Sequence, residues 1–187
     1  MLVNRTMGAL AALLCAGGAF AQDQAEQRKA PATKLEAFQS RTGVVLMRGY
    51  STVGTLRALG GEITVDAREF RDGSSPNSPR TMGIPITVRE TGRLDRENTS
   101  YIDAEEIDSL LKGIEYISKV TKGVTKLAQF EVDYRTKGDL RSTVFNSRNG
   151  DTSAVVSTGA IGRTKAYVKL AELETLRELI ATAKSKL

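Results

Sequence analysis

Residues 103–123 read DAEEIDSLLKGIEYISKVTKG, and this stretch carries the clearest secondary-structure signal in the 187-residue chain. Asp103 stands where a helix N-cap is expected, and Glu106 follows at the spacing of a capping box. Gly123, after two lysines, is a typical helix terminator. Apolar residues recur at helical spacing between these ends: Ile107, Leu110, Leu111, Ile114 and Ile117. The stretch therefore predicts a helix over about residues 104–121 whose apolar stripe covers a sheet.

Strand-like alternation of apolar and polar residues precedes this helix. The apolar positions fall in two runs: Ile63, Val65 and Ala67, then Met82, Ile84, Ile86 and Val88. Glycines are expected to break the segment after Val44 into short strands and turns: Gly49, Gly54, Gly60 and Gly61. Pro85 has no backbone N–H to donate to a neighbouring strand. Its strand is therefore predicted to lie at a sheet edge.

The segment after the helix repeats this order. Alternation and turn residues predict four strands, at about residues 130–135, 140–146, 152–157 and 163–170. A last apolar stripe predicts a C-terminal amphipathic helix: Leu173, Leu176, Leu179, Ile180 and Ala183. We therefore expect an α+β fold with antiparallel sheets in a repeated strands-then-helix order, about ββββα twice, with the helices packed on one face or capping a curved barrel. This order resembles the topology of the PUR and Whirly class of single-strand nucleic-acid binders, a likeness of topology without a shared motif.

The N-terminal residues have the pattern of a cleavable export signal. A basic start, Met1 to Arg5, precedes an apolar run over residues 7–16, which is shorter than the ~20 residues of a membrane-spanning helix. Ala19 and Ala21 flank Phe20 in the small-x-small pattern that signal peptidase reads. We expect cleavage after Ala21, a flexible polar tail over residues 22–34 and a single domain over residues 35–187. The mature protein is then secreted, periplasmic or extracellular, with no stable membrane span.

Composition restricts the chemistry of the expected mature chain. The sequence has no histidine and no tryptophan, and its single cysteine, Cys15, lies in the expected signal. Without thiol or imidazole, the mature chain cannot form disulfides, Ser-His-Asp or Cys-His catalytic sites, or the usual zinc, copper and haem sites. We therefore expect no cofactor. The net charge of +5 for the whole chain is mildly basic and favours weak attraction to anions.

Acidic residues supply an alternative hypothesis, a carboxylate-based hydrolase. Four acids fall in one predicted helical turn: Asp103, Glu105, Glu106 and Asp108. Helix capping and the helix dipole account for acids at these positions without any catalytic role. Glu131 and Asp133 share one face of a predicted strand, which a solvated sheet face also explains. No metal site is predicted from these groups.

Basic and aromatic residues interleave in the last predicted strands. If Val144 and Val168 face the core, the outward face carries five candidate binding residues: Arg141, Phe145, Lys165, Tyr167 and Lys169. Bases interleaved with aromatic rings can stack on and hold an anionic polymer. The alternative is a polar sheet face covered by another element, and the nearby acids Glu131 and Asp133 weaken the positive field.

The leading hypothesis is a secreted or periplasmic, non-catalytic binding or structural module whose partner is an anionic polymer or another envelope protein. It rests on the missing catalytic side chains and on the absence of any phosphate, metal or nucleotide motif in the sequence. Two alternatives stay open. One is the carboxylate-based hydrolase, and the other is a binder of single-stranded nucleic acid or an anionic envelope polymer through the basic and aromatic face.

Overall fold

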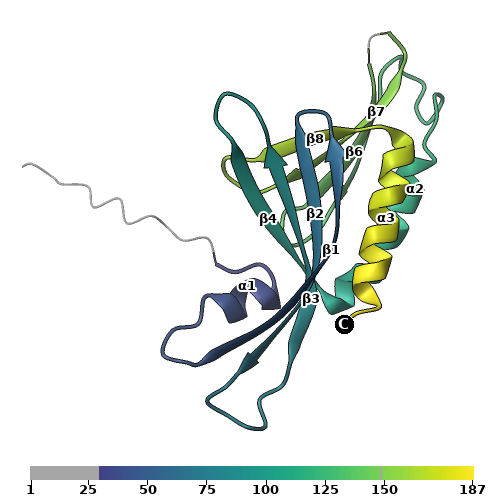
Figure 1. The fold of residues 1–187 in the computed structure, drawn as a ribbon. Coiled ribbons are helices and arrows are strands. Elements are labelled where there is room, and N and C mark those ends of the chain that lie inside the picture. The colour runs from purple at the N-terminus through teal and green to yellow at the C-terminus, as the bar shows by residue number, and fades with distance from the viewer. Residues whose placement is uncertain (1–29, 148) are drawn as a thin grey trace, which may run out of the picture.

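The computed structural model describes residues 30–147 and 149–187, which form two four-stranded antiparallel sheets and three α-helices (Figure 1). The first sheet has the order β1 (Leu46–Ala58), β2 (Gly61–Asp72), β3 (Thr81–Glu90) and β4 (Arg96–Asp103). The second has the order β5 (Glu131–Arg135), β6 (Arg141–Asn146), β7 (Thr152–Thr158) and β8 (Thr164–Val168). The predicted α+β class with antiparallel sheets is confirmed. Within the described residues neither sheet closes into the barrel considered above.

The expected signal peptide, with Cys15, Ala19 and Ala21, lies outside the described residues. The expected tail over residues 22–34 overlaps the described part at its end, where Thr33 is buried and Lys34 begins the helix α1 (Lys34–Gln39). None of the helices in the described ranges has the length and apolar character needed to cross a membrane.

β1 is one strand of 13 residues, where several short strands were predicted. Its glycines lie inside the strand because neighbouring side chains fill the space above them. A Cβ at Gly49 would lie 2.9 Å from Cγ of Glu69, and one at Gly54 would lie 2.7 Å from Cδ2 of Leu179. The pairing with β2 shifts by one residue between Thr52 and Gly54, a β-bulge that divides the strand into Leu46–Thr52 and Gly54–Ala58, each in regular register.

β3 is a central strand, so the prediction that Pro85 marks a sheet edge is wrong. The ladder with β2 pairs Val65 with Ile86 and next Arg68 with Gly83, which leaves Pro85 without a partner on that side. On the β4 side the pairing is continuous. The sheet accommodates the missing N–H by an interruption of one ladder inside the sheet.

The predicted helix begins with a 3₁₀ turn, η1 (Ala104–Glu106), and continues as α2 (Ile107–Ser118). Asp103 makes no cap hydrogen bond to it, so the predicted capping box is wrong. Its buried carboxylate accepts hydrogen bonds from the backbone N–H groups of Lys34 (2.9 Å) and Leu35 (3.1 Å) in the first turn of α1. The reason is geometric, because Asp103 still pairs with Gly83 as the last residue of β4 and faces α1.

α1 lies on the opposite face of the first sheet from the other two helices, so the helices do not all share one face (Figure 1). Thr33 and Glu36 form a capping box at its start. Its buried side chains Leu35 and Phe38 cover Phe70 of β2, and the two phenyl rings stack with centroids 5.8 Å apart. This outer cluster is separate from the main core.

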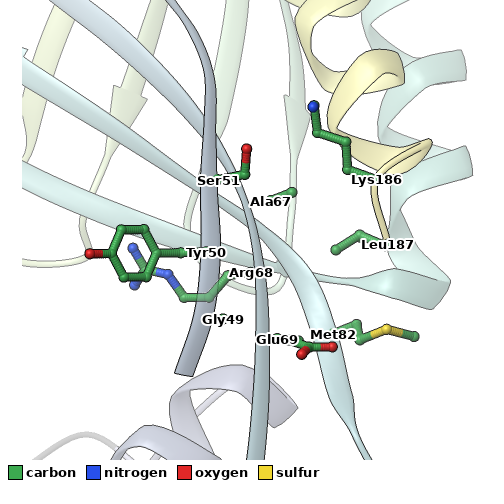
Figure 2. A pocket seen from close by; sticks show the side chains of 9 residues that line it. All are labelled: Gly49, Tyr50, Ser51, Ala67, Arg68, Glu69, Met82, Lys186 and Leu187. Atoms are coloured by element: carbon green, nitrogen blue, oxygen red, sulfur yellow. The ribbon is translucent and has the colours of Figure 1, made fainter. Parts of the chain in front are cut away.

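The first sheet continues past the C-terminal end of α3 (Leu170–Lys184). Figure 2 shows this lower part of the sheet, with Tyr50 and Arg68 projecting away from Lys186 and Leu187. Tyr50 and Arg68 are paired in register on neighbouring strands. A hollow of about 300 Å³ lies here between β1, β2, β3 and the end of the chain.

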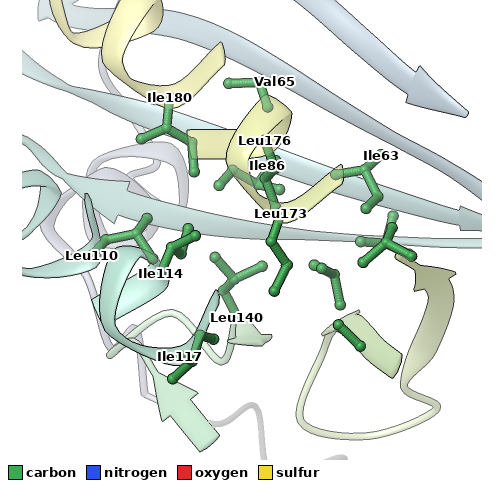
Figure 3. Close-up of a cluster of buried hydrophobic side chains, with 14 of the residues drawn as sticks. Ile63, Val65, Ile86, Leu110, Ile114, Ile117, Leu140, Leu173, Leu176 and Ile180 are labelled. Atoms are coloured by element: carbon green, nitrogen blue, oxygen red, sulfur yellow. The ribbon is translucent and has the colours of Figure 1, made fainter. Parts of the chain in front are cut away.

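The main core lies between the inner faces of both sheets and the helices α2 and α3, which pack side by side (Figure 3). The predicted stripe of α2 is confirmed, since all but the half-buried Leu111 are buried: Ile107, Leu110, Ile114 and Ile117. The predicted stripe of α3 is confirmed in the same way, since all but the half-buried Leu179 are buried: Leu173, Leu176, Ile180 and Ala183. Continuous burial of this kind is the main source of stability in a domain of this size.

The sheets meet at one corner, where polar side chains join them. The hydroxyl of Thr158 donates to the carbonyl of Asn98 (2.9 Å), and that of Thr164 donates to the carbonyl of Val88 (2.9 Å). Near the hairpin between β1 and β2, the backbone of Leu59 exchanges two hydrogen bonds with that of Tyr167 (2.9 and 3.0 Å). The hairpin of the first sheet therefore covers the outer edge of β8 at Tyr167.

Candidate functional site

The outward face of the second sheet brings the five candidate binding residues together. Val144 and Val168 are buried in the core, as the sequence interpretation assumed. The register then places Arg141 in line with Lys165 across β7, and places Tyr167 in the next row. Phe145 belongs to β6, and Lys169 directly follows β8.

Two hollows flank the aromatic residues on this face. One, of about 300 Å³, is lined by Arg141 and Lys165 together with the neighbouring Arg163. The other, of about 540 Å³, is lined by Lys169 and by residues of the β1–β2 hairpin. Phe145 and Tyr167 line both hollows, so these two aromatic residues lie where the hollows adjoin.

The face is open along β8. Tyr167 is 45% exposed, and Lys165 and Lys169 are exposed as well. Phe145 and Arg141 are half-buried against their neighbours on the sheet. A ligand can therefore reach the β8 side of this face as the described chain stands.

Charge is distributed unevenly across the face. Nη1 of Arg141 lies 3.6 Å from the Asp133 carboxylate, which also accepts a hydrogen bond from Thr143. The Nε of Arg141 is buried without a hydrogen-bond partner among the described residues. Because an adjacent acid offsets its charge and its side chain is partly buried, Arg141 contributes less to anion attraction than its sequence position indicated.

Arg163 is a site residue that the sequence interpretation missed. Its Nε donates a 3.0 Å hydrogen bond to the carbonyl of Gly159, which holds the side chain beside the first hollow. Within the described residues no ion pair engages Arg163, Lys165 or Lys169. The signal was present in the sequence, since Arg163 has the same parity as Lys165, Tyr167 and Lys169.

The acids of the hydrolase hypothesis are engaged in structural contacts. Asp103 binds the backbone of α1, and one Glu106 oxygen accepts a hydrogen bond from the backbone N–H of Lys137 (2.9 Å). Glu105 pairs with Lys34, and Asp108 lies 2.5 Å from Nζ of Lys184. Among the described residues, no cluster of three or more acids forms that could hold a metal ion.

The pKa shifts of the carboxyl groups also argue against the hydrolase hypothesis. Five carboxyl groups have a pKa below the ordinary value, each because of a hydrogen bond from a cationic side chain: Asp95, Glu105, Asp108, Glu115 and Glu174. A general acid in a glycosidase-type site needs a raised pKa. None of these five groups supports the hydrolase hypothesis.

Comparisons with known proteins add no functional information. No model of a protein family, no curated protein and no solved structure matches this chain. The topological resemblance to the PUR and Whirly class therefore has no matching solved structure behind it. The basic and aromatic face of the second sheet is the feature of this chain that points most directly to a ligand.

Proposed function

We propose that this protein is a non-catalytic binding module of the periplasm or the extracellular space that holds an anionic chain along β8. The observation that carries the proposal is one line of outward side chains: Arg163, Lys165, Tyr167 and Lys169. Alternate residues of a strand lie ~6.7 Å apart on one face, so three cations and one ring follow one another over roughly 20 Å. A flexible polyanion that lies along this line meets a cation or an aromatic ring every ~6.7 Å.

Two kinds of interaction would contribute to binding. The cations neutralise charges of the polymer and release its counterions, which makes affinity fall with salt. Tyr167, with Phe145 beside it, offers a ring face for planar groups of the ligand. Glu131 and Asp133 repel an anion from the β5 side, so the path along β8 is favoured over a path across the sheet.

We further propose that one strands-then-helix unit is used twice, with different tasks. The element order supports this, since β1–β4 lead into α2 and β5–β8 lead into α3. The first unit, which carries the second small cluster under α1, would be the scaffold. The second unit would present the ligand face.

The proposed location outside the cytoplasm rests on the basic, apolar and small-x-small order of residues 1–21. Intact-mass analysis of exported protein tests it, and we expect a chain that starts at Gln22. A mature product that retains Met1 would contradict this part of the proposal without affecting the binding face.

The binding proposal is tested with the mature chain and three probes, namely single-stranded oligothymidine, polyphosphate and an anionic polysaccharide, each titrated at several salt concentrations. The double variant Lys165→Ala with Lys169→Ala should flatten the salt dependence for single-stranded DNA, by ~0.7 in logarithmic slope for each cation lost. Arg163→Ala, which removes one cation, should flatten the salt dependence by ~0.7 in logarithmic slope. Lys112→Ala with Lys126→Ala is the matched control, because both lysines are exposed elsewhere on the surface.

The aromatic residues identify the class of polymer. Phe145→Ala with Tyr167→Ala should weaken binding of single-stranded DNA at every salt concentration, by ~1–3 kcal/mol for each stacked base. Binding of polyphosphate, which has no rings, should not change. Equal and weak binding of all three probes to the wild type and every variant would show that this face is an ordinary sheet surface.

A further inference from the structure

The lower half of β1 is an open sheet edge. β1 is the end strand of the first sheet, and no described strand pairs with the outer edge of its first regular part, Leu46–Thr52. Its side chains are also exposed, with Met47 at 54% and Tyr50 at 75%. Proteins usually shield such an edge, because its free N–H and C=O groups can pair with another strand.

We propose that this edge pairs with the same edge of a second copy of the chain, antiparallel and with the two-fold axis at Gly49. Gly49 is the middle residue of the regular segment Leu46–Thr52, so this register pairs every residue of the segment. An axis perpendicular to the sheet keeps the outward faces of both copies on one side. The two four-stranded sheets would then form one continuous sheet of eight strands.

The side chains are self-complementary in this register. Arg48 lies opposite Tyr50 of the second copy, and the symmetry repeats this pair, so each guanidinium meets a ring. Within its own sheet Tyr50 already pairs with Arg68, and Figure 2 shows the two side chains on the same side of β1. Gly49 lies opposite Gly49 of the second copy at the axis.

A two-fold axis moved by one residue toward the N-terminus, to Arg48, is less favourable. It places Arg48 opposite Arg48, which sets like charges directly against each other. A shift the other way brings the bulge after Thr52 into the ladder and disrupts the pairing there. The Gly49 register therefore gives the longest uninterrupted pairing, and it places side chains that attract each other, Arg48 and Tyr50, in opposite positions.

The oligomeric state of the mature chain tests the proposal by sedimentation velocity over a wide concentration range. We expect a concentration-dependent dimer for the wild type. Tyr50→Lys should weaken it by roughly tenfold or more, since it sets two cationic pairs against each other across the axis. Adding Arg48→Glu to Tyr50→Lys should restore the dimer, because each pair then has opposite charges. Arg48 and Tyr50 are both exposed, so unchanged thermal unfolding of the variants shows that the monomer fold is intact.

Cysteine cross-linking fixes the register independently. The mature chain is expected to have no cysteine, so Arg48→Cys and Tyr50→Cys each introduce a single thiol. An equal mixture of the two variants should give disulfide-linked heterodimers on oxidation, because directly opposite Cα atoms lie ~4.5–5.5 Å apart. Each variant alone should stay unlinked, since residue 48 is diagonal to its own copy. A monomer at all concentrations, a dimer indifferent to Tyr50→Lys, or linkage of the single variants alone would overturn the proposal.

Discussion

The outward faces of the two sheets have different neighbours. In the first sheet, strands of 13, 12, 10 and 8 residues extend far enough for α1 to pack on the outward face and bury Phe70. In the second sheet, strands of 5, 6, 7 and 5 residues carry a half-buried Phe145 and an exposed Tyr167 on the same kind of face. An aromatic residue on an outward sheet face thus contributes to stability in one sheet and is available to a ligand in the other.

The difference between the two outward faces follows from the length of the strands and from one buried carboxylate, that of Asp103. The long strands of the first sheet run past the main core, and their outward surface needs cover of its own. Asp103 ties α1 to this surface through two backbone N–H groups. Among the described residues the second sheet has no such tether on its outward face, where Tyr167 is exposed.

The largest difference is expected between two phenylalanines on the outward sheet faces, Phe70 of β2 and Phe145 of β6. Phe70→Ala should lower the free energy of unfolding by about 3–5 kcal/mol, because Phe70 is fully buried beneath α1. Phe145→Ala should lower it by less than about 1.5 kcal/mol, because Phe145 is half-exposed. Urea unfolding measures both. Equal losses would mean that the two faces are packed alike and would break the comparison.

A smaller loss of stability is expected when the contact between Asp103 and α1 is removed. Asp103→Ala removes two hydrogen bonds from α1 backbone groups to a buried carboxylate and should lower the free energy of unfolding by about 2–3 kcal/mol. Limited proteolysis should show faster cleavage near residues 34–45 in this variant, because α1 is less firmly held. Asp103→Asn keeps one oxygen acceptor and should lose less. If α1 stays protected in the alanine variant, the tether is not what holds it.

The corner between the sheets should give a still smaller effect. Thr164→Val keeps the shape of the side chain but removes a buried hydroxyl that donates to Val88 and lies 3.0 Å from the hydroxyl of Thr158. We expect a loss of about 1–2 kcal/mol in thermal or urea unfolding. Thr52→Val on exposed β1 is the control and should be nearly neutral. A neutral Thr164→Val would show that the Thr164 hydroxyl does not help to hold the sheets together.

The smallest effect is expected between the two helices. The hydrogen bond from Lys184 lowers the pKa of Asp108 in the folded chain, so any stability from this pair is present above the unfolded-state pKa and is lost as the pH falls through the lowered one. Lys184→Ala should return the pKa of Asp108 toward its ordinary value. Carboxyl carbon NMR titration of the two proteins measures the change. An unchanged Asp108 titration would contradict the α2–α3 ion pair.

Local patterns were sufficient to predict most elements of both sheets. The spacing of apolar residues indicates which side chains are buried. It alternates at Ile63, Val65 and Ala67, and it is helical at Leu110 and Ile114. Burial of these side chains determines the fold. The errors arose where a partner comes from far along the chain. Leu179 fills the space at Gly54, and α1 takes the carboxylate of Asp103. No local pattern contains either contact.

In the candidate site, too, local patterns predicted some features, while others depend on residues from another strand. Parity along two strands was enough to put Arg141, Phe145, Lys165 and Tyr167 on one face, because successive side chains of a strand alternate. The partner of Arg141 was not predictable, because it depends on the register between β5 and β6, which places Asp133 opposite Thr143. Charge on a sheet face is therefore set by cross-strand neighbours as much as by the residues of one strand.

The backbone pair between Leu59 and Tyr167 has a consequence for how β8 can hold a ligand. Alternate residues of a strand direct their N–H and C=O groups to the same edge, so this pair occupies the outer edge of β8 at Tyr167. The N–H of Lys169 is also taken, by the carboxylate of Glu172 at 2.7 Å. The main-chain groups of Tyr167 and Lys169 are therefore not free to pair with an incoming peptide strand, and at these two residues only side chains can make contact. Contacts of that kind impose no fixed registry, so a polyanion on β8 would be free to slide lengthwise without dissociating.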